Sequence, residues 1–255
     1  MNPIDQGSVS HHIEKHVATI TFEHPLSNSL PGKVLNQLAN TIADLGQDPA
    51  VSVILVQSAG ERAFCAGASF DELVAIDDLE VGKGFFSGFA NVINACRKCP
   101  KLIIGRVQGK AVGGGVGLAA AFDYTMATQF ASVKLSELAV GIGPFVVGPA
   151  VERKIGLSAM SQLAINATEW QSAQWAKDKG LYTEIYENVE ALDTGIEALL
   201  QKLRGSNPEA MQLLKKVFWE GTEHWDHLLA ERAAMSGQLV LSDFTKNAIN
   251  SFKKK

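Results

Sequence analysis

The hydrophobic pattern of the first half of the chain alternates between the period of a strand and the period of a helix. VATITF (17–22) places apolar residues at every second position, which predicts a half-buried strand. Apolar residues recur at helical spacing over 34–45, and VSVILVQ (51–57) is a nearly continuous apolar run of strand length. A second predicted helix, 85–98, leads into another buried strand, LIIGRV (102–107). This alternation predicts an α/β core.

The second half of the chain changes toward helices. An alanine-rich helix precedes a predicted strand, YTMAT (124–128), and from about Val147 onward helical patterns dominate, interrupted by one late strand at 181–186. The segment 189–252 predicts three helices, with Pro208 near the start of the middle one, where its missing N–H does no harm. Because no Pro/Gly/Ser-rich linker separates the halves, the pattern favours one α/β core with a helical C-terminal extension.

The composition of the chain limits which partners and which cellular compartment we expect. Of the 255 residues, 46% are hydrophobic, and the net charge of −4 argues against nucleic acid or an anionic membrane as the main partner. With no stretch typical of a signal peptide or membrane span, and an odd count of three cysteines, we expect a cytoplasmic protein. Cys96 and Cys99 form a C-x-x-C motif, but no second pair completes a metal site, so we interpret both as structural thiols and expect no metal.

The glycine cluster GKAVGGGVGLAAAFDY (109–124) has three interpretations. Gly115, Gly117 and Ala120 satisfy G-x-G-x-x-[GA], and Glu137 lies 20 residues beyond Gly117, as in a dinucleotide fingerprint. That motif normally joins the first strand of a βαβ unit, whereas here roughly a hundred residues come first. A nicotinamide-binding oxidoreductase is therefore a remote alternative. A second interpretation is that small residues merely allow close backbone packing.

The third interpretation uses the exposed backbone at a helix start. The N–H groups at 113–115 have no intrahelical acceptor, and the helix dipole adds partial positive charge there, which suits a developing oxyanion. A second turn of small residues, Ala66-Gly67-Ala68 within ERAFCAGASFDEL (61–73), also exposes backbone N–H groups. Two such loops aimed at one carbonyl oxygen would form an oxyanion hole.

An ordered set of motifs runs along nearly the whole chain: HPLSNSL, ERAFCAGASFDEL, KLIIGRVQGKAVGGGVGLAAAFDY, KLSELAVGIGP and SAQWAKDKGL. In this set the sequence resembles the crotonase superfamily, the enoyl-CoA hydratases and isomerases. The resemblance implies a crotonase-like spiral of ββα units with a helical C-terminal extension. It also implies a core over 1–190, a helical region over 191–255 that forms part of the acyl pocket and oligomer contacts, and a homotrimer or dimer of trimers.

The resemblance further implies an acyl-CoA thioester as substrate, with no cofactor beyond its coenzyme A. The thioester oxygen would accept hydrogen bonds from the backbone N–H groups of Ala68 and Gly114, with Glu137 as the catalytic acid-base. Arg62 matches a basic residue that lies near the CoA phosphates. Further residues expected at the substrate are Ala66, Gly67, Gly113, Gly117 and Pro144. Read without the resemblance, Glu137 could also be a surface acid at a helix cap.

One position departs from the pattern of the family's hydratases, which carry two catalytic glutamates. The first of these positions is occupied by Gly117, whereas the second is Glu137. Hydration must position and deprotonate water, but a single group that removes a proton at C2 and returns it at C4 moves a double bond. The sequence therefore favours Δ3-to-Δ2 enoyl-CoA isomerisation over hydration. A non-catalytic CoA-binding scaffold remains an alternative, as does a second acid elsewhere, the candidates being Asp71, Glu72, Asp77 and Asp78.

Overall fold

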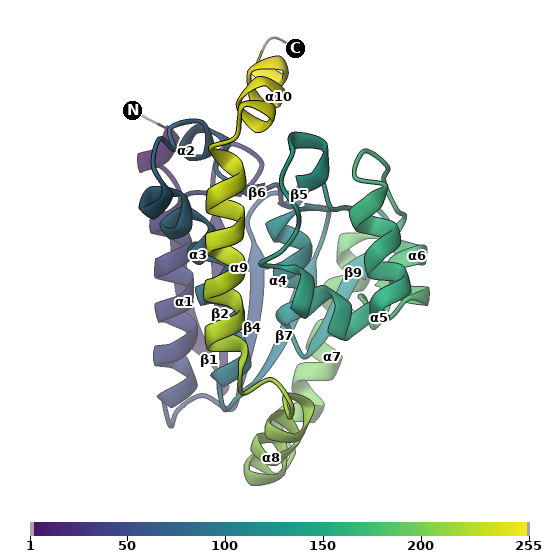
Figure 1. Ribbon diagram of the computed structural model, residues 1–255. Coiled ribbons are helices and arrows are strands. Elements are labelled where there is room, and N and C mark those ends of the chain that lie inside the picture. The colour runs from purple at the N-terminus through teal and green to yellow at the C-terminus, as the bar shows by residue number, and fades with distance from the viewer. Residues whose placement is uncertain (1–2, 254–255) are drawn as a thin grey trace.

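The computed structural model describes residues 3–253, and its framework is a six-stranded sheet with the order β1-β2-β4-β7-β9-β11 (Figure 1). Its strands are β1 (Ser8–Glu14), β2 (Val17–Glu23), β4 (Val53–Ser58), β7 (Leu102–Val107), β9 (Tyr124–Thr128) and β11 (Glu184–Tyr186). Strand β1 runs antiparallel to β2, and each of the other neighbouring pairs is parallel. The apolar runs that predicted β4, β7 and β9 therefore form the centre of the sheet.

Helices connect these strands and cover both faces of the sheet. They are α1 (Gly32–Gln47), α2 (Phe70–Val74), α3 (Leu79–Lys98), α4 (Gly114–Ala121), α5 (Gly148–Ile165), α6 (Ala173–Asp178), α7 (Val189–Arg204), α8 (Pro208–Phe218), α9 (Trp225–Val240) and α10 (Asp243–Lys253). On one face α1, α3 and α9 pack side by side, with α4 and α5 next to them (Figure 1). Between residues 3 and 253, none of these helices has the length and hydropathy needed to span a membrane.

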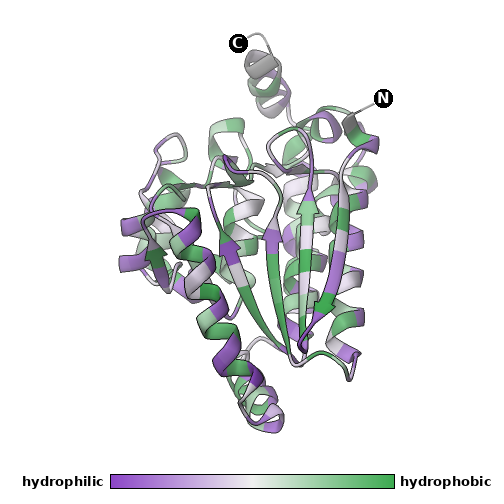
Figure 2. Cartoon of the chain, turned by 180° about the vertical axis from the view of Figure 1, so that it is seen from behind, coloured by the Kyte–Doolittle hydropathy of each residue, from purple (hydrophilic) through white to green (hydrophobic). Residues whose placement is uncertain are grey.

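The alternation of side chains along the strands divides the core into two layers. Ile54 and Val56 of β4 belong to the main cluster shared with α1, α3 and α4, whereas Leu55 belongs to a second cluster with Leu192 and Ile196 of α7. From behind, α7 crosses the sheet (Figure 2). Burial on both faces explains why the central strands are apolar at consecutive positions. The predicted α/β core with a C-terminal helical region is confirmed.

Two small sheets bring four distant segments together beside the start of α4. Strand β3 (Ser29–Leu30) pairs with β6 (Gly67–Ala68). A second, parallel sheet has the order β10-β8-β5, formed by β10 (Val133–Lys134), β8 (Lys110–Val112) and β5 (Ala63–Cys65). These pairings hold the 66–68 turn, the glycine cluster and the segment before Glu137 against one another.

The C-terminal region differs from its prediction in the number of helices. We expected three helices over 189–252, and this is wrong, because four stand there: α7, α8, α9 and α10. The separation of the last two depends on a polar residue, since Ser242 Oγ accepts a hydrogen bond from the N–H of Thr245 at 3.3 Å and begins α10. Pro208 is the first residue of α8, as predicted. The predicted boundary between 190 and 191 falls inside α7, and the division into two regions stays a prediction.

Candidate active site

A cavity of about 600 Å³ opens between the 66–68 turn and the start of α4. Most of its wall is apolar, formed by Phe70, Leu73, Phe85, Phe86, Phe89, Val140, Ile142, Val146 and Val147 among others. Its polar groups are few: backbone at the two glycine-containing loops, the side chains of the segment 134–137, and the hydroxyls of Ser29, Thr168 and Ser236. An apolar cavity with a few convergent polar groups is typical of a small-molecule site.

Two glycines allow the loops at this cavity to touch. Gly113 adopts φ 52°, a region that favours glycine, and its N–H donates to the carbonyl of Lys134 at 2.9 Å. Gly67 has φ 96°, and a Cβ placed there would lie 3.1 Å from the carbonyl oxygen of Val112 and 3.6 Å from the nitrogen of Gly114. The turn that contains Ala68 therefore lies directly against the start of α4.

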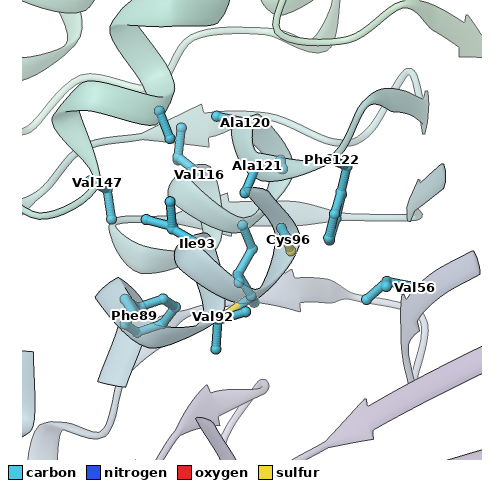
Figure 3. Packing of buried hydrophobic residues seen from close by; sticks show 14 of the residues in the cluster. Val56, Phe89, Val92, Ile93, Cys96, Val116, Ala120, Ala121, Phe122 and Val147 are labelled. Atoms are coloured by element: carbon cyan, nitrogen blue, oxygen red, sulfur yellow. The ribbon is translucent and has the colours of Figure 1, made fainter. Parts of the chain in front are cut away.

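Ala68 and Gly114, the two residues expected to donate backbone hydrogen bonds, both line the cavity. The N–H of Gly114 belongs to the first turn of α4, where backbone donors have no intrahelical acceptor. A Cβ at 114 would lie 2.3 Å from Cζ of Phe89, which packs against α4, so a larger residue would force this ring to move (Figure 3). The backbones of both residues therefore meet at one mainly apolar cavity, where fixed N–H dipoles can stabilise negative charge.

Glu137 begins the short 3-10 helix η2 (Glu137–Val140), and its side chain lies over Gly113. A Cβ placed on Gly113 would be 3.0 Å from Oε1 of Glu137, while Oε2 is buried with no hydrogen-bond partner among the described residues. Burial raises the pKa of this carboxyl to about 7, because desolvation disfavours the charged form more than the hydrogen bond from its own backbone N–H favours it. The alternative of a surface acid at a helix cap is wrong.

Gly117, which we expected at the substrate, does not line the cavity. Inside α4 it faces Val147, and a Cβ there would lie 2.4 Å from Cγ1 of Val147. Val147 lines the cavity itself and is among the buried side chains around α4 in Figure 3. The prediction for Gly117 is therefore wrong, because Val147 fills the space that a side chain at 117 would need to reach the cavity.

None of the four alternative acids lines the cavity. Glu72 Oε2 accepts a hydrogen bond from the N–H of Gly32 at 2.8 Å, and Asp78 caps α3 by accepting from the N–H of Val81 at 2.9 Å. Asp77 is exposed at the surface. Within residues 3–253, Glu137 is the only carboxylic acid in the wall of the cavity.

The remaining expected contacts divide between the cavity and the surface. Ala66, Gly67, Gly113 and Pro144 line the cavity. Arg62 is exposed and stands outside the cavity wall, so its contact with a CoA phosphate stays a prediction.

The dinucleotide interpretation of the glycine cluster is wrong. A Cβ at Gly115 would lie 2.4 Å from the carbonyl oxygen of Cys65, just as Gly117 is covered by Val147, so the glycine faces are filled by protein and not open to a pyrophosphate. Glu137 stands in the cavity wall and not at the end of a strand next to a ribose site. At 115 and 117 the interpretation of close backbone packing is confirmed.

Sequence analysis assigned no role at the site to Lys134 or to Trp170. Lys134 lines the cavity together with Ser136, two positions further along, and its ammonium nitrogen lies 4.6 Å from the centroid of the Trp170 ring. The signal that could have found both residues is their place in the sequence, three and one positions before Glu137.

Comparisons with known proteins agree with this geometry. A family model described as enoyl-CoA hydratase/isomerase matches residues 12–255. The chain is 27% identical over 245 residues to a short-chain-enoyl-CoA hydratase of Clostridium acetobutylicum, covering 95% of this chain and 93% of that protein. It is 29% identical over 206 residues to carnitinyl-CoA dehydratase of Escherichia coli K12, covering 79% and 76% of the two chains. The crystal structure of an enoyl-CoA hydratase from Bacillus halodurans superposes with a TM-score of 0.88 at 21% identity, covering 95% of this chain and 99% of that one.

Proposed function

This chain belongs to the enoyl-CoA hydratase/isomerase family, and from that premise we propose that it moves the double bond of a 3-enoyl-CoA to position 2. The observation that carries the proposal is that Glu137 is the only carboxylic acid in the cavity wall of the described chain. A single carboxylate suffices for a proton shuttle between two carbons. The steric block at Gly117 explains why a second acid is not supplied from α4.

The proposed reaction has two proton transfers. The thioester oxygen accepts hydrogen bonds from the N–H groups of Ala68 and Gly114, and Glu137 removes a proton from C2, whose bonding electrons form the enolate. The carbonyl of the enolate then re-forms, and the C1=C2 electrons form the new C2=C3 bond. The electrons of the old C3=C4 bond take the proton back from Glu137 at C4. The apolar wall excludes water that would compete for this proton.

Hydration is a second candidate, favoured by the names of the relatives, which are a hydratase and a dehydratase. It requires a carboxylate to take a proton from water while C2 receives one. With Glu137 alone, both tasks fall on one group. An inactive CoA-binding scaffold is disfavoured by the same residue, because a buried carboxyl costs stability when, among the residues that the structure describes, one of its oxygens has no hydrogen-bond partner.

One assay separates these functions. Purified protein is incubated with 3-hexenoyl-CoA and, separately, with 2-hexenoyl-CoA, and the ultraviolet absorbance of the conjugated thioester and the product mass are followed. Isomerisation of 3-hexenoyl-CoA raises the absorbance and leaves the mass unchanged. Hydration of 2-hexenoyl-CoA lowers the absorbance and adds the mass of one water. We expect the first result to dominate by at least about tenfold in kcat/KM. Dominant hydration would reject isomerisation, and inactivity on both substrates would favour the scaffold.

The pH dependence of the reaction should report the ionisation of Glu137. Because the base must be charged to accept a proton and burial raises its pKa to about 7, kcat/KM is expected to rise with pH through about 7 and then level off. An ordinary exposed glutamate would already be fully ionised at pH 6. The measurement is kcat/KM for 3-hexenoyl-CoA from pH 5 to 9, with stability checked at each pH. A profile that is flat from pH 5.5 upward would contradict Glu137 as the base.

We also propose a trimer or dimer of trimers located in the cytoplasm, acting without a cofactor beyond the coenzyme A of the substrate. Support for assembly comes from α8, which exposes four apolar side chains: Leu213, Leu214, Val217 and Phe218. An apolar group of this kind on one helix is typical of a surface covered by another subunit.

A further inference from the structure

Two lysines emerge from the same face of the small sheet beside the cavity. In the parallel pair β8–β10, Lys134 is in register with Val112, and Lys110 lies two residues before Val112. Residues two apart on a strand share a face, and residues in register across two strands share it as well. The side chains of Lys110 and Lys134 therefore project in the same direction, on the face where Val112 and Lys134 form part of the cavity wall.

Trp170 brings the two lysines together. Val133 and Gln171 exchange two backbone hydrogen bonds of 2.9 Å in an antiparallel bridge, which places Trp170 opposite Lys134. The ammonium nitrogens of Lys110 and Lys134 lie 5.0 and 4.6 Å from the centroid of the Trp170 ring. Trp170 is 42% exposed and Lys134 lines the cavity, so this cluster of Lys110, Lys134 and Trp170 lies where the cavity meets the surface.

The cluster carries uncompensated positive charge. Among the described residues, no carboxylate lies within 4.0 Å of either ammonium group, whereas Lys15, Lys98 and Lys215 each form an ion pair. The face of an aromatic ring attracts a cation, but it does not cancel the repulsion between two of them. An anion bound between or beside the two ammonium groups would remove this repulsion.

The position of Lys134 indicates which anion binds at this cluster. It stands three residues before Glu137, and its carbonyl accepts the hydrogen bond of Gly113 N–H, so its backbone belongs to the reacting centre. The phosphates of coenzyme A are separated from the thioester by the whole pantetheine arm. Because the Lys134 side chain starts from main chain beside the base and lines the cavity, it is better placed for the acyl group.

We infer that the acyl group of the substrate carries a carboxylate at its far end, and that the ammonium group of Lys134, reinforced by Lys110, binds it. This inference rests on the proposed function for the identity of the cavity as an acyl-CoA site. The Lys134 end of the cavity accepts the charged terminus, while the aromatic wall from α3 packs against the chain. The substrate class is thus the mono-CoA thioesters of unsaturated dicarboxylic acids.

The test is a binding measurement on thioesters that cannot react. Dissociation constants are determined by titration calorimetry for glutaryl-CoA against pentanoyl-CoA and for adipoyl-CoA against hexanoyl-CoA. In at least one matched pair we expect the carboxylate to tighten binding about tenfold, as for a hydrogen bond to a charged group. Lys134→Gln should abolish this preference, Lys110→Gln should reduce it about threefold, and Lys134→Arg should retain most of it. Lys216→Gln, at an exposed lysine of α8, is the matched control and should leave the preference unchanged.

Three results would overturn the inference. One is the lack of any preference for the carboxylate in either pair with the unaltered protein. Another is a preference that survives Lys134→Gln in a variant whose thermal unfolding is unchanged. A third is equal weakening of both members of a pair by Lys134→Gln, which would assign the lysine to the CoA phosphates. Because saturated thioesters have no double bond to move, this outcome is independent of whether the isomerase assay succeeds.

Discussion

Replacing Glu137 by glutamine is expected to lower kcat for the isomerisation of 3-hexenoyl-CoA at least about a hundredfold. Glutamine has nearly the same shape and occupies the same place over Gly113, but it cannot take the proton from C2 or return it at C4. Substrate binding should change little, because the oxyanion donors are backbone groups at Ala68 and Gly114. The measurement is kcat and KM at pH 8, where the carboxylate of the unaltered protein is ionised.

Glu72→Gln is the matched control for this experiment. Glu72 is a half-buried glutamate outside the cavity wall, and the amide oxygen of glutamine can still accept the hydrogen bond from Gly32 N–H. We expect its kcat to stay within about twofold of the unaltered enzyme, as for a substitution that removes no reacting group. If Glu137→Gln turned over substrate as fast as this control, the proton shuttle would have to be assigned to another group.

Introducing the acid that hydratases of the family carry, by Gly117→Glu, is expected to destabilise the protein by about 4 kcal/mol. A Cβ at 117 would already lie 2.4 Å from Cγ1 of Val147, and the remainder of the side chain would place a carboxyl group among buried apolar residues. For a chain of this size such a loss corresponds to a fall in Tm of about 10 °C. Calorimetric unfolding at pH 7 measures it.

A second helical glycine provides the comparison. Gly84 on α3 is exposed, and a Cβ there would meet nothing within 4 Å, so Gly84→Glu should leave Tm unchanged or raise it slightly through better helix propensity. Adding Val147→Gly to Gly117→Glu removes the clash and should recover part of the lost Tm. An unchanged Tm in the single variant would show that α4 and α5 separate readily and that Val147 does not block this position.

The central sheet and the two loops of the site were predictable because their signals are local. LIIGRV and YTMAT form strands over the predicted residues, since continuous apolar runs fit a sheet that is covered on both faces. The 66–68 turn and the start of α4 were identified because small residues next to a helix start expose backbone N–H groups whatever surrounds them. Their convergence on one cavity followed from the resemblance of the motifs to a known family.

The features that sequence reasoning missed depend on partners far along the chain. β1 was not predicted because it is an edge strand in which only Val9 is buried, which leaves no alternating pattern. Gly117 was placed at the substrate because it occupies the position of the first family glutamate, and nothing local shows that its open face is covered by Val147 from the next helix. The pairing of Lys110 and Lys134 around Trp170 likewise depends on strand register that no single segment encodes.

The buried carboxyl of Glu137 also affects how the stability of the protein depends on pH. The pKa of this carboxyl is near its ordinary value of 4.5 in the unfolded chain and about 7 in the folded protein. The contribution of this group to the free energy of unfolding therefore falls as pH rises between these values, by about 3 kcal/mol in total. Most acidic groups that form ion pairs act in the opposite direction. Through this one group, folding is favoured in mildly acidic solution, where the proposed base is neutral, and part of that stabilisation is lost at neutral pH, where the base can act.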